Sequence, residues 1–142
     1  MKTHLAIAAS ALVLGACAMA QTWEQSKEPP PKPFVGTRWQ VILELPLPGE
    51  QPYIRMGDGR LEGFGGCNRI NARYLSDAVG ARAIAFTAMS VSKRMCDPSI
   101  MAAEQRMIET LQFVSSYTIT GAAMTMSGSS GQLKLLAVEP PK

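Results

Sequence analysis

Three cysteines and one histidine are the residues of this chain best suited to nucleophilic or metal chemistry. The histidine, His4, lies in an N-terminal segment that we expect to be removed. Catalysis by a serine or cysteine with histidine, and metal sites with histidine ligands, are therefore not expected in the mature protein. The roles of Cys17, Cys67 and Cys96 then depend on the compartment that the chain reaches.

Residues 1–16 have the order of a signal peptide: a basic end with Lys2, an apolar run from Leu5 to Leu14, and then small residues. The apolar run is shorter than the ~20 residues that span a membrane. Its end, Leu-Gly-Ala-Cys at residues 14–17, resembles a bacterial lipobox. This resemblance implies that Cys17 becomes the lipidated first residue; the alternative is an ordinary signal peptide with a chance cysteine.

A tether is expected at residues 17–34, which are mostly polar and include four prolines near their end. Such a segment favours extended polyproline geometry and acts as a semi-rigid spacer, although a disordered tail would also fit. Ala18 follows the lipobox cysteine. By resemblance to bacterial lipoproteins, a residue other than Asp there implies an outer-membrane anchor facing the periplasm.

If Cys17 carries lipid, Cys67 and Cys96 remain, and two thiols in an oxidising compartment usually pair. A bond between them would close a loop of about 29 residues, which is worth roughly 3–4 kcal/mol. A structural zinc site would need about four Cys or His ligands, which the mature chain does not supply. A reactive thiol pair has no C-x-x-C spacing to support it. We therefore expect a disulfide and no cofactor.

The stretch GFGGCN, Gly63 to Asn68, places glycines directly before Cys67. Gly63, Gly65 and Gly66 permit positive φ angles and close backbone approach, as a bulge or a sharp turn between strands requires. A strand-like alternation follows, rather than the helix of a phosphate-binding loop. Asn68 is expected to bond the backbone of its own turn.

Carboxylates and arginines are the remaining groups that could act on a ligand. Asp58 and Glu62 are close in sequence, but they lie in or beside a turn, where carboxylates are usually solvated; we expect no enzymatic activity. Five arginines cluster in the same part of the chain, which alternation predicts to be a meander of strands: Arg55, Arg60, Arg69, Arg73 and Arg82. They could face anionic lipid or peptidoglycan carboxylates, or form a solvated sheet surface. A net charge of +3 does not favour nucleic acid as a partner.

These residues must be positioned by strands and one helix. Alternating apolar and polar residues predict strands at 38–45, 51–56, 60–64, 69–75, 83–89, 116–120, 123–127 and 132–138. The helix is expected from about Pro98 to Phe113, with Asp97 as its N-cap. Its apolar face comprises Ile100, Ala103, Met107, Leu111 and Val114, while Glu104, Gln105 and Glu109 fill other faces. The class is α+β: a curled antiparallel sheet or partial β-barrel of about seven to eight short strands, with one helix packed against it.

The composition fits one globular domain with an aliphatic core, since 142 residues are 46% hydrophobic and only 6% aromatic. The nine methionines add to this core. The inside of the curled sheet is either a packed core or a groove for an acyl chain or a partner's apolar segment. Met124 and Met126 share one strand face, which suits either Cu(I) or a Met-rich core.

Several motifs together resemble the META domain of HslJ-like heat-shock proteins of the bacterial envelope. They are Gly63-x-Gly65-Gly66-Cys67-Asn68-Arg69, then Met95-Cys96 before a helix carrying Glu104 and Leu111, with Trp39 near the start. The match covers residues 35–138 and leaves 139–142 as a tail. The segment Ser90 to Cys96 departs from the family's usual spacing. The resemblance implies a domain without accepted catalytic activity, whose fold is similar to that of a lipid-binding pilot lipoprotein.

Taken with this resemblance, which implies a stress-associated envelope domain, these observations predict a non-enzymatic envelope lipoprotein with a binding role in stress tolerance. Its expected partners are the membrane, through the N-terminal lipid, and an envelope protein or lipid. We expect a monomer. An acyl-chain carrier or a Cu(I) module are the alternatives, and a small hydrolase is less favoured.

Overall fold

The computed structural model describes residues 29–76 and 82–139. The predicted signal peptide and Cys17 lie outside the described residues. The elements are β1 (Arg38–Val41), β2 (Tyr53–Gly57), β3 (Arg60–Phe64), β4 (Arg69–Ser76), β5 (Ile84–Val91), α1 (Pro98–Gln112), β6 (Val114–Thr120), β7 (Ala123–Gly128) and β8 (Gly131–Val138). No helix in the described part of the chain is long and apolar enough to cross a membrane.

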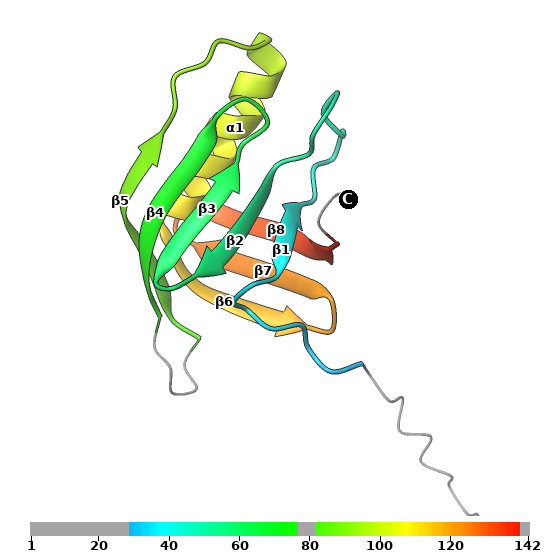
Figure 1. The fold of residues 1–142 in the computed structure, drawn as a ribbon, viewed down its shortest axis with the longest axis vertical. Coiled ribbons are helices and arrows are strands. Elements are labelled where there is room, and N and C mark those ends of the chain that lie inside the picture. The colour runs from blue at the N-terminus through cyan, green and yellow to red at the C-terminus, as the bar shows by residue number, and fades with distance from the viewer. Residues whose placement is uncertain (1–28, 77–81, 140–142) are drawn as a thin grey trace, which may run out of the picture.

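The strands form one antiparallel sheet in the order β5-β4-β3-β2-β1-β8-β7-β6. The sheet curls into a half-barrel, and α1 packs against its inner side (Figure 1). Its two edge strands approach each other at one end, where Ala83 bridges Ser116 and the Tyr117 amide donates to the Arg82 carbonyl at 3.0 Å. The predicted α+β class with a curled sheet and one helix is confirmed.

Alternation decides which face of each strand is buried. In β4, Ile70 and Ala72 are buried while Arg69, Asn71 and Arg73 are exposed. Apolar side chains on the concave face lose their contact with water, and the convex face keeps the charged ones.

The first predicted strand, residues 38–45, is too long. β1 ends at Val41, and Leu45 is 81% exposed instead of sharing the buried face of Trp39 and Val41. On one side the partner strand β2 begins only at Tyr53, after Pro52, which has no amide proton for the ladder. Beyond Val41 the chain therefore leaves the sheet as a loop.

The inside of the half-barrel is a packed core. Trp39, Ile54 and Leu61 from the strands and Leu111 from α1 are fully buried within one cluster. Because these side chains occupy the concave face, the interior is filled core rather than an open groove.

Helix α1 matches its prediction except at three points. Asp97 occupies the N-cap position, but its side chain makes no capping bond; its carbonyl instead accepts from the amides of Ile100 and Met101. Phe113 follows the last helical residue, and Val114 starts β6. Glu104, expected on a polar face, is 5% exposed and lies among the buried residues of the helix.

Candidate functional site

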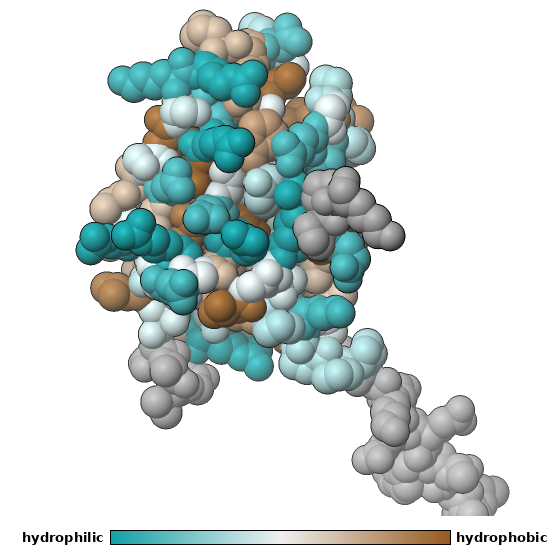
Figure 2. Space-filling model, viewed as in Figure 1, coloured by the Kyte–Doolittle hydropathy of each residue, from teal (hydrophilic) through white to brown (hydrophobic). Residues whose placement is uncertain are grey.

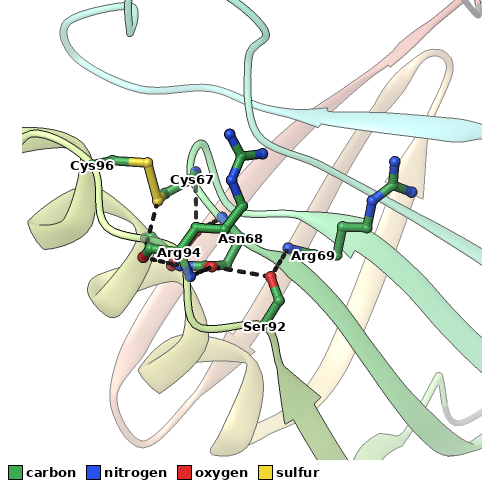
Figure 3. Close-up of a disulfide and its surroundings, with 7 residues drawn as sticks. Cys67, Asn68, Arg69, Ser92, Arg94 and Cys96 are labelled. Carbon is green, nitrogen blue, oxygen red and sulfur yellow. Dashed lines mark hydrogen bonds between the residues drawn. A yellow bond between two sulfur atoms is a disulfide. The ribbon is translucent and has the colours of Figure 1, made fainter.

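A disulfide joins the turn between β3 and β4 to the segment before α1 (Figure 3). The Cys67 and Cys96 sulfurs are 2.07 Å apart and their Cα atoms 6.0 Å apart. The predicted pairing is confirmed. The bond ties the β3–β4 turn to the N-terminal end of the helix.

Glu104 lies beneath the same turn and binds its backbone. Its carboxylate accepts hydrogen bonds from the amides of Cys67 at 3.1 Å and Asn68 at 2.6 Å, and from Asn68 Nδ2 at 2.7 Å. Bonds to an ionised acceptor are roughly twice as strong as neutral ones. A Cβ on Gly65 would lie 2.5 Å from a carboxylate oxygen of Glu104, so only glycine allows this approach.

Asn68 connects the turn to the segment after β5, and the prediction that it bonds its own turn is wrong. Its Oδ1 accepts from Ser92 Oγ at 3.0 Å and from the Arg94 amide at 2.6 Å. The side chain is buried, so its partners must come from neighbouring segments rather than from water. We call Cys67, Asn68, Ser92, Cys96 and Glu104 together the brace.

The polar side chains of the brace have their hydrogen-bond partners within the protein. Every buried side-chain nitrogen and oxygen of the described residues has a hydrogen-bond partner. The family motif residues Gly65, Gly66, Cys67 and Asn68 are therefore used to hold the turn, the loop before α1 and the helix together. Met95, also part of the motif, is 85% exposed beside the disulfide.

Sequence reasoning missed the central role of Glu104, although a signal existed. Ile100, Glu104, Met107 and Leu111 are spaced by four, three and four residues, which places the glutamate on the apolar stripe of the helix. A charged residue on such a stripe is almost never fully buried unless it is paired. The glycines before Cys67 mark the turn that approaches Glu104 closely, and the amides of Cys67 and Asn68 in that turn donate to its carboxylate.

Asp58 and Glu62, the two carboxylates considered for acid–base chemistry, are both at the surface. Glu62 makes an ion pair with Arg55 at 3.2 Å on the outer face of the sheet. Asp58 lies in the β2–β3 turn with a positive φ of 49°. Both side chains are exposed, as expected for solvated carboxylates beside a turn.

Met124 and Met126 are both buried in the core cluster, 1% and 0% exposed. Among the described residues, no group of three or more His, Cys, Asp or Glu side chains is placed to hold a metal ion. The packing of the two methionines among aliphatic side chains fits their role as core residues.

A surface groove of ≈ 990 Å³ runs between α1 and the loop after β1. Val41, Leu43, Leu45 and Leu47 form one wall, and Ala103 and Met107 belong to the helical side. The β3–β4 turn lies against this wall at Gly66, whose φ is +109°. A Cβ added to Gly66 would lie only 2.6 Å from the Cδ1 of Leu47. A side chain at residue 66 would push Leu47 away from its present position.

Comparisons with known proteins agree with this architecture. The chain is similar in fold to a protein from Burkholderia xenovorans solved by NMR, with 14% identity, a TM-score of 0.58, and coverage of 75% of this chain and 85% of the other. It is also similar to a DUF4847 family protein from Bacteroides vulgatus, with 12% identity, a TM-score of 0.54, and coverage of 76% and 96%. No curated protein matches the sequence. The model of the META domain family matches residues 32–140, most of the chain, and the protein therefore belongs to the META domain family.

Proposed function

We propose that this META domain protein is anchored to the bacterial envelope by lipid on Cys17, and that it acts by binding in envelope stress tolerance rather than by catalysis. The observation that carries the proposal is the use of the family motif. The groups that could do chemistry, the Cys67 thiol and the Glu104 carboxylate, are engaged in the disulfide and in three hydrogen bonds. The motif thus maintains a shape, which is what a binding protein requires.

We place the binding site in the groove between α1 and the loop after β1. Its loop wall holds Ile42 and Leu45, which are 55% and 81% exposed, while Met107 and Leu133 at its other side are buried. Exposed apolar side chains beside a buried apolar floor favour a hydrophobic segment of an envelope protein as the partner. An acyl chain is the alternative occupant.

Growth of a deletion strain under heat, with plasmid-borne variants, tests this function. The double variant Ile42→Asp with Leu45→Asp places two charges on the groove wall and should abolish rescue. Leu75→Asp is the matched control, because Leu75 is 70% exposed and does not line the groove. Rescue by the double variant at wild-type protein levels would refute the groove as the binding surface.

Two further measurements separate the parts of the proposal. Mass spectrometry of the mature N-terminus should find acylated Cys17, and Cys17→Ala should release the protein from the membrane fraction. A photoreactive residue at position 45 should cross-link to one protein or to lipid, and the same residue at position 75 should not. Cross-linking to lipid alone would select the acyl-chain alternative over a protein segment.

A further inference from the structure

The outer face of the half-barrel carries arginines in opposed positions. Arg60 on β3 lies directly opposite Arg73 on β4. Arg55 on β2 and Arg69 on β4 point to the same outer face of the sheet. All four are exposed. Figure 2 shows this side of the molecule, where hydrophilic side chains cover the strands. Like charges directly opposite each other in a sheet are destabilising, so the pair Arg60–Arg73 needs an explanation.

Among the described residues, the carboxylates on this face are too few to neutralise the positive charge of its arginines. Arg38 pairs with Glu50 at 2.8 Å and Arg55 with Glu62 at 3.2 Å, and these are the ion pairs of the described chain. Arg60, Arg69 and Arg73 are in neither pair. When Asp58 in the adjoining turn is counted, the described residues of this surface comprise five arginines, Arg38 and the four named above, and three carboxylates, those of Glu50, Asp58 and Glu62. An external anion would relieve the repulsion that the pairing of β3 with β4 imposes.

The Arg60–Arg73 pair lies at the end of the sheet where the N-terminal segment joins it. Val35 bridges Met56, and the Gly36 amide donates to the Met56 carbonyl at 2.9 Å, one residue before the β2–β3 turn. The Phe34 ring contacts Tyr74, the neighbour of Arg73, with centroids 5.6 Å apart. Figure 1 shows the start of β1 and the β2–β3 turn at the same end of the molecule.

We propose that the face formed by Arg55, Arg60, Arg69 and Arg73 binds the phosphate headgroups of anionic phospholipids. Its orientation toward the membrane rests on the proposed anchor. The chain leaves the domain past the β6–β7 turn, where the Lys32 amide donates to the Gly121 carbonyl at 2.8 Å, after Val35 and Gly36 have contacted β2 beside the β2–β3 turn. The guanidinium fork binds phosphate oxygens in pairs, and basic residues near an anionic bilayer are drawn to it.

Aromatic side chains on the same face suit this interfacial role. The rings of Tyr53 and Phe64 lie 6.4 Å apart, between centroids, on adjacent strands, and the Arg38 guanidinium stacks 3.4 Å from the centre of the Tyr53 ring. Tyrosine and arginine each combine an apolar body with a polar tip, which suits the boundary between headgroups and water.

Sedimentation with vesicles tests the proposal independently of the anchor. The chain from residue 17 with Cys17→Ala is mixed with vesicles of phosphatidylcholine alone, or of equal parts phosphatidylcholine and phosphatidylglycerol. We expect binding only to the anionic vesicles and a decrease with added salt. Arg60→Gln with Arg73→Gln should weaken it about 25-fold, since each basic residue near such a surface contributes roughly fivefold.

A charge-matched control removes the same two charges elsewhere. Arg106→Gln with Lys134→Gln, exposed charges on α1 and β8 rather than on β2–β4, should weaken binding much less. Glu62→Gln removes a carboxylate from the arginine face and should strengthen binding. Equal losses for the two double variants, or sedimentation with purified peptidoglycan in preference to anionic vesicles, would overturn the proposal. Neither result bears on acylation of Cys17, which is measured separately by mass.

Discussion

The two ends of the half-barrel are closed by different means. Near the end of β5, the brace joins the sheet to α1 through a disulfide and a buried carboxylate with three hydrogen bonds. Near the start of β5, the edge strands meet through the Ala83–Ser116 bridge, and Phe34 stacks on Tyr117 with centroids 4.5 Å apart. One end therefore depends on covalent and charged contacts, and the other on aromatic packing by the N-terminal segment.

The motif from Gly63 to Arg69, with Met95 and Cys96, lies at the end where the contacts are covalent and charged. Buried polar contacts require specific partners at specific distances, so they restrict the residue types at Gly65, Asn68 and Glu104. Aromatic packing tolerates more variation, because it depends mainly on area and shape. Four variants measure how far the two ends, and the core between them, differ.

Glu104→Leu should have the largest effect. It leaves the amides of Cys67 and Asn68 and the Asn68 side chain without their acceptor in a buried site, at a cost on the order of 4–5 kcal/mol in the free energy of unfolding. Chemical denaturation measures it. Glu109→Leu on the exposed side of the same helix should change stability by less than about 0.5 kcal/mol. A loss below about 1 kcal/mol for Glu104→Leu would show that the carboxylate does not hold this end.

Removing the disulfide should come next. Cys67→Ala with Cys96→Ala should cost roughly 3–4 kcal/mol, because the unfolded chain regains the freedom of a closed loop. The Glu104 contacts remain, so the folded state should persist with a lower melting temperature. The wild-type protein treated with reductant should melt at the same lower temperature. Equal melting points with and without reductant would contradict this role of the bond.

Phe34→Ala tests the opposite end and should cost about 1–2 kcal/mol through the loss of its contacts with Tyr74 and Tyr117. Hydrogen exchange should accelerate at the amides of β6 while those of α1 near the brace stay protected. Phe113→Ala, at a 55% exposed position, is the control and should leave β6 exchange unchanged. Uniform acceleration over the whole sheet would mean that the two ends do not open separately.

The smallest effect is expected between the two ends, in the shared core. Met124→Leu with Met126→Leu conserves volume and should cost less than about 1.5 kcal/mol. Because both side chains are buried among aliphatic residues, we expect Cu(I) affinity, measured by competition with a chromogenic chelator, to remain unchanged. A large fall in affinity would instead support the copper-binding alternative.

The sequence by itself determined the local elements and the disulfide. Alternation predicted Arg60–Phe64 as a strand, helical spacing predicted α1, and the count of cysteines left Cys67 and Cys96 to pair. Each of these depends on contacts between near neighbours or on the number of reactive groups, both of which are readable along the chain.

Only the tertiary structure decided the partners. Glu104 and Asn68 are far apart in sequence, and their bonds exist because α1 crosses beneath the β3–β4 turn. The early end of β1, the burial of Met124 and Met126, and the opposition of Arg60 and Arg73 likewise follow from which strands pair and where the sheet curls. Long-range pairing is set by the sum of all core contacts, which no single segment of the sequence contains.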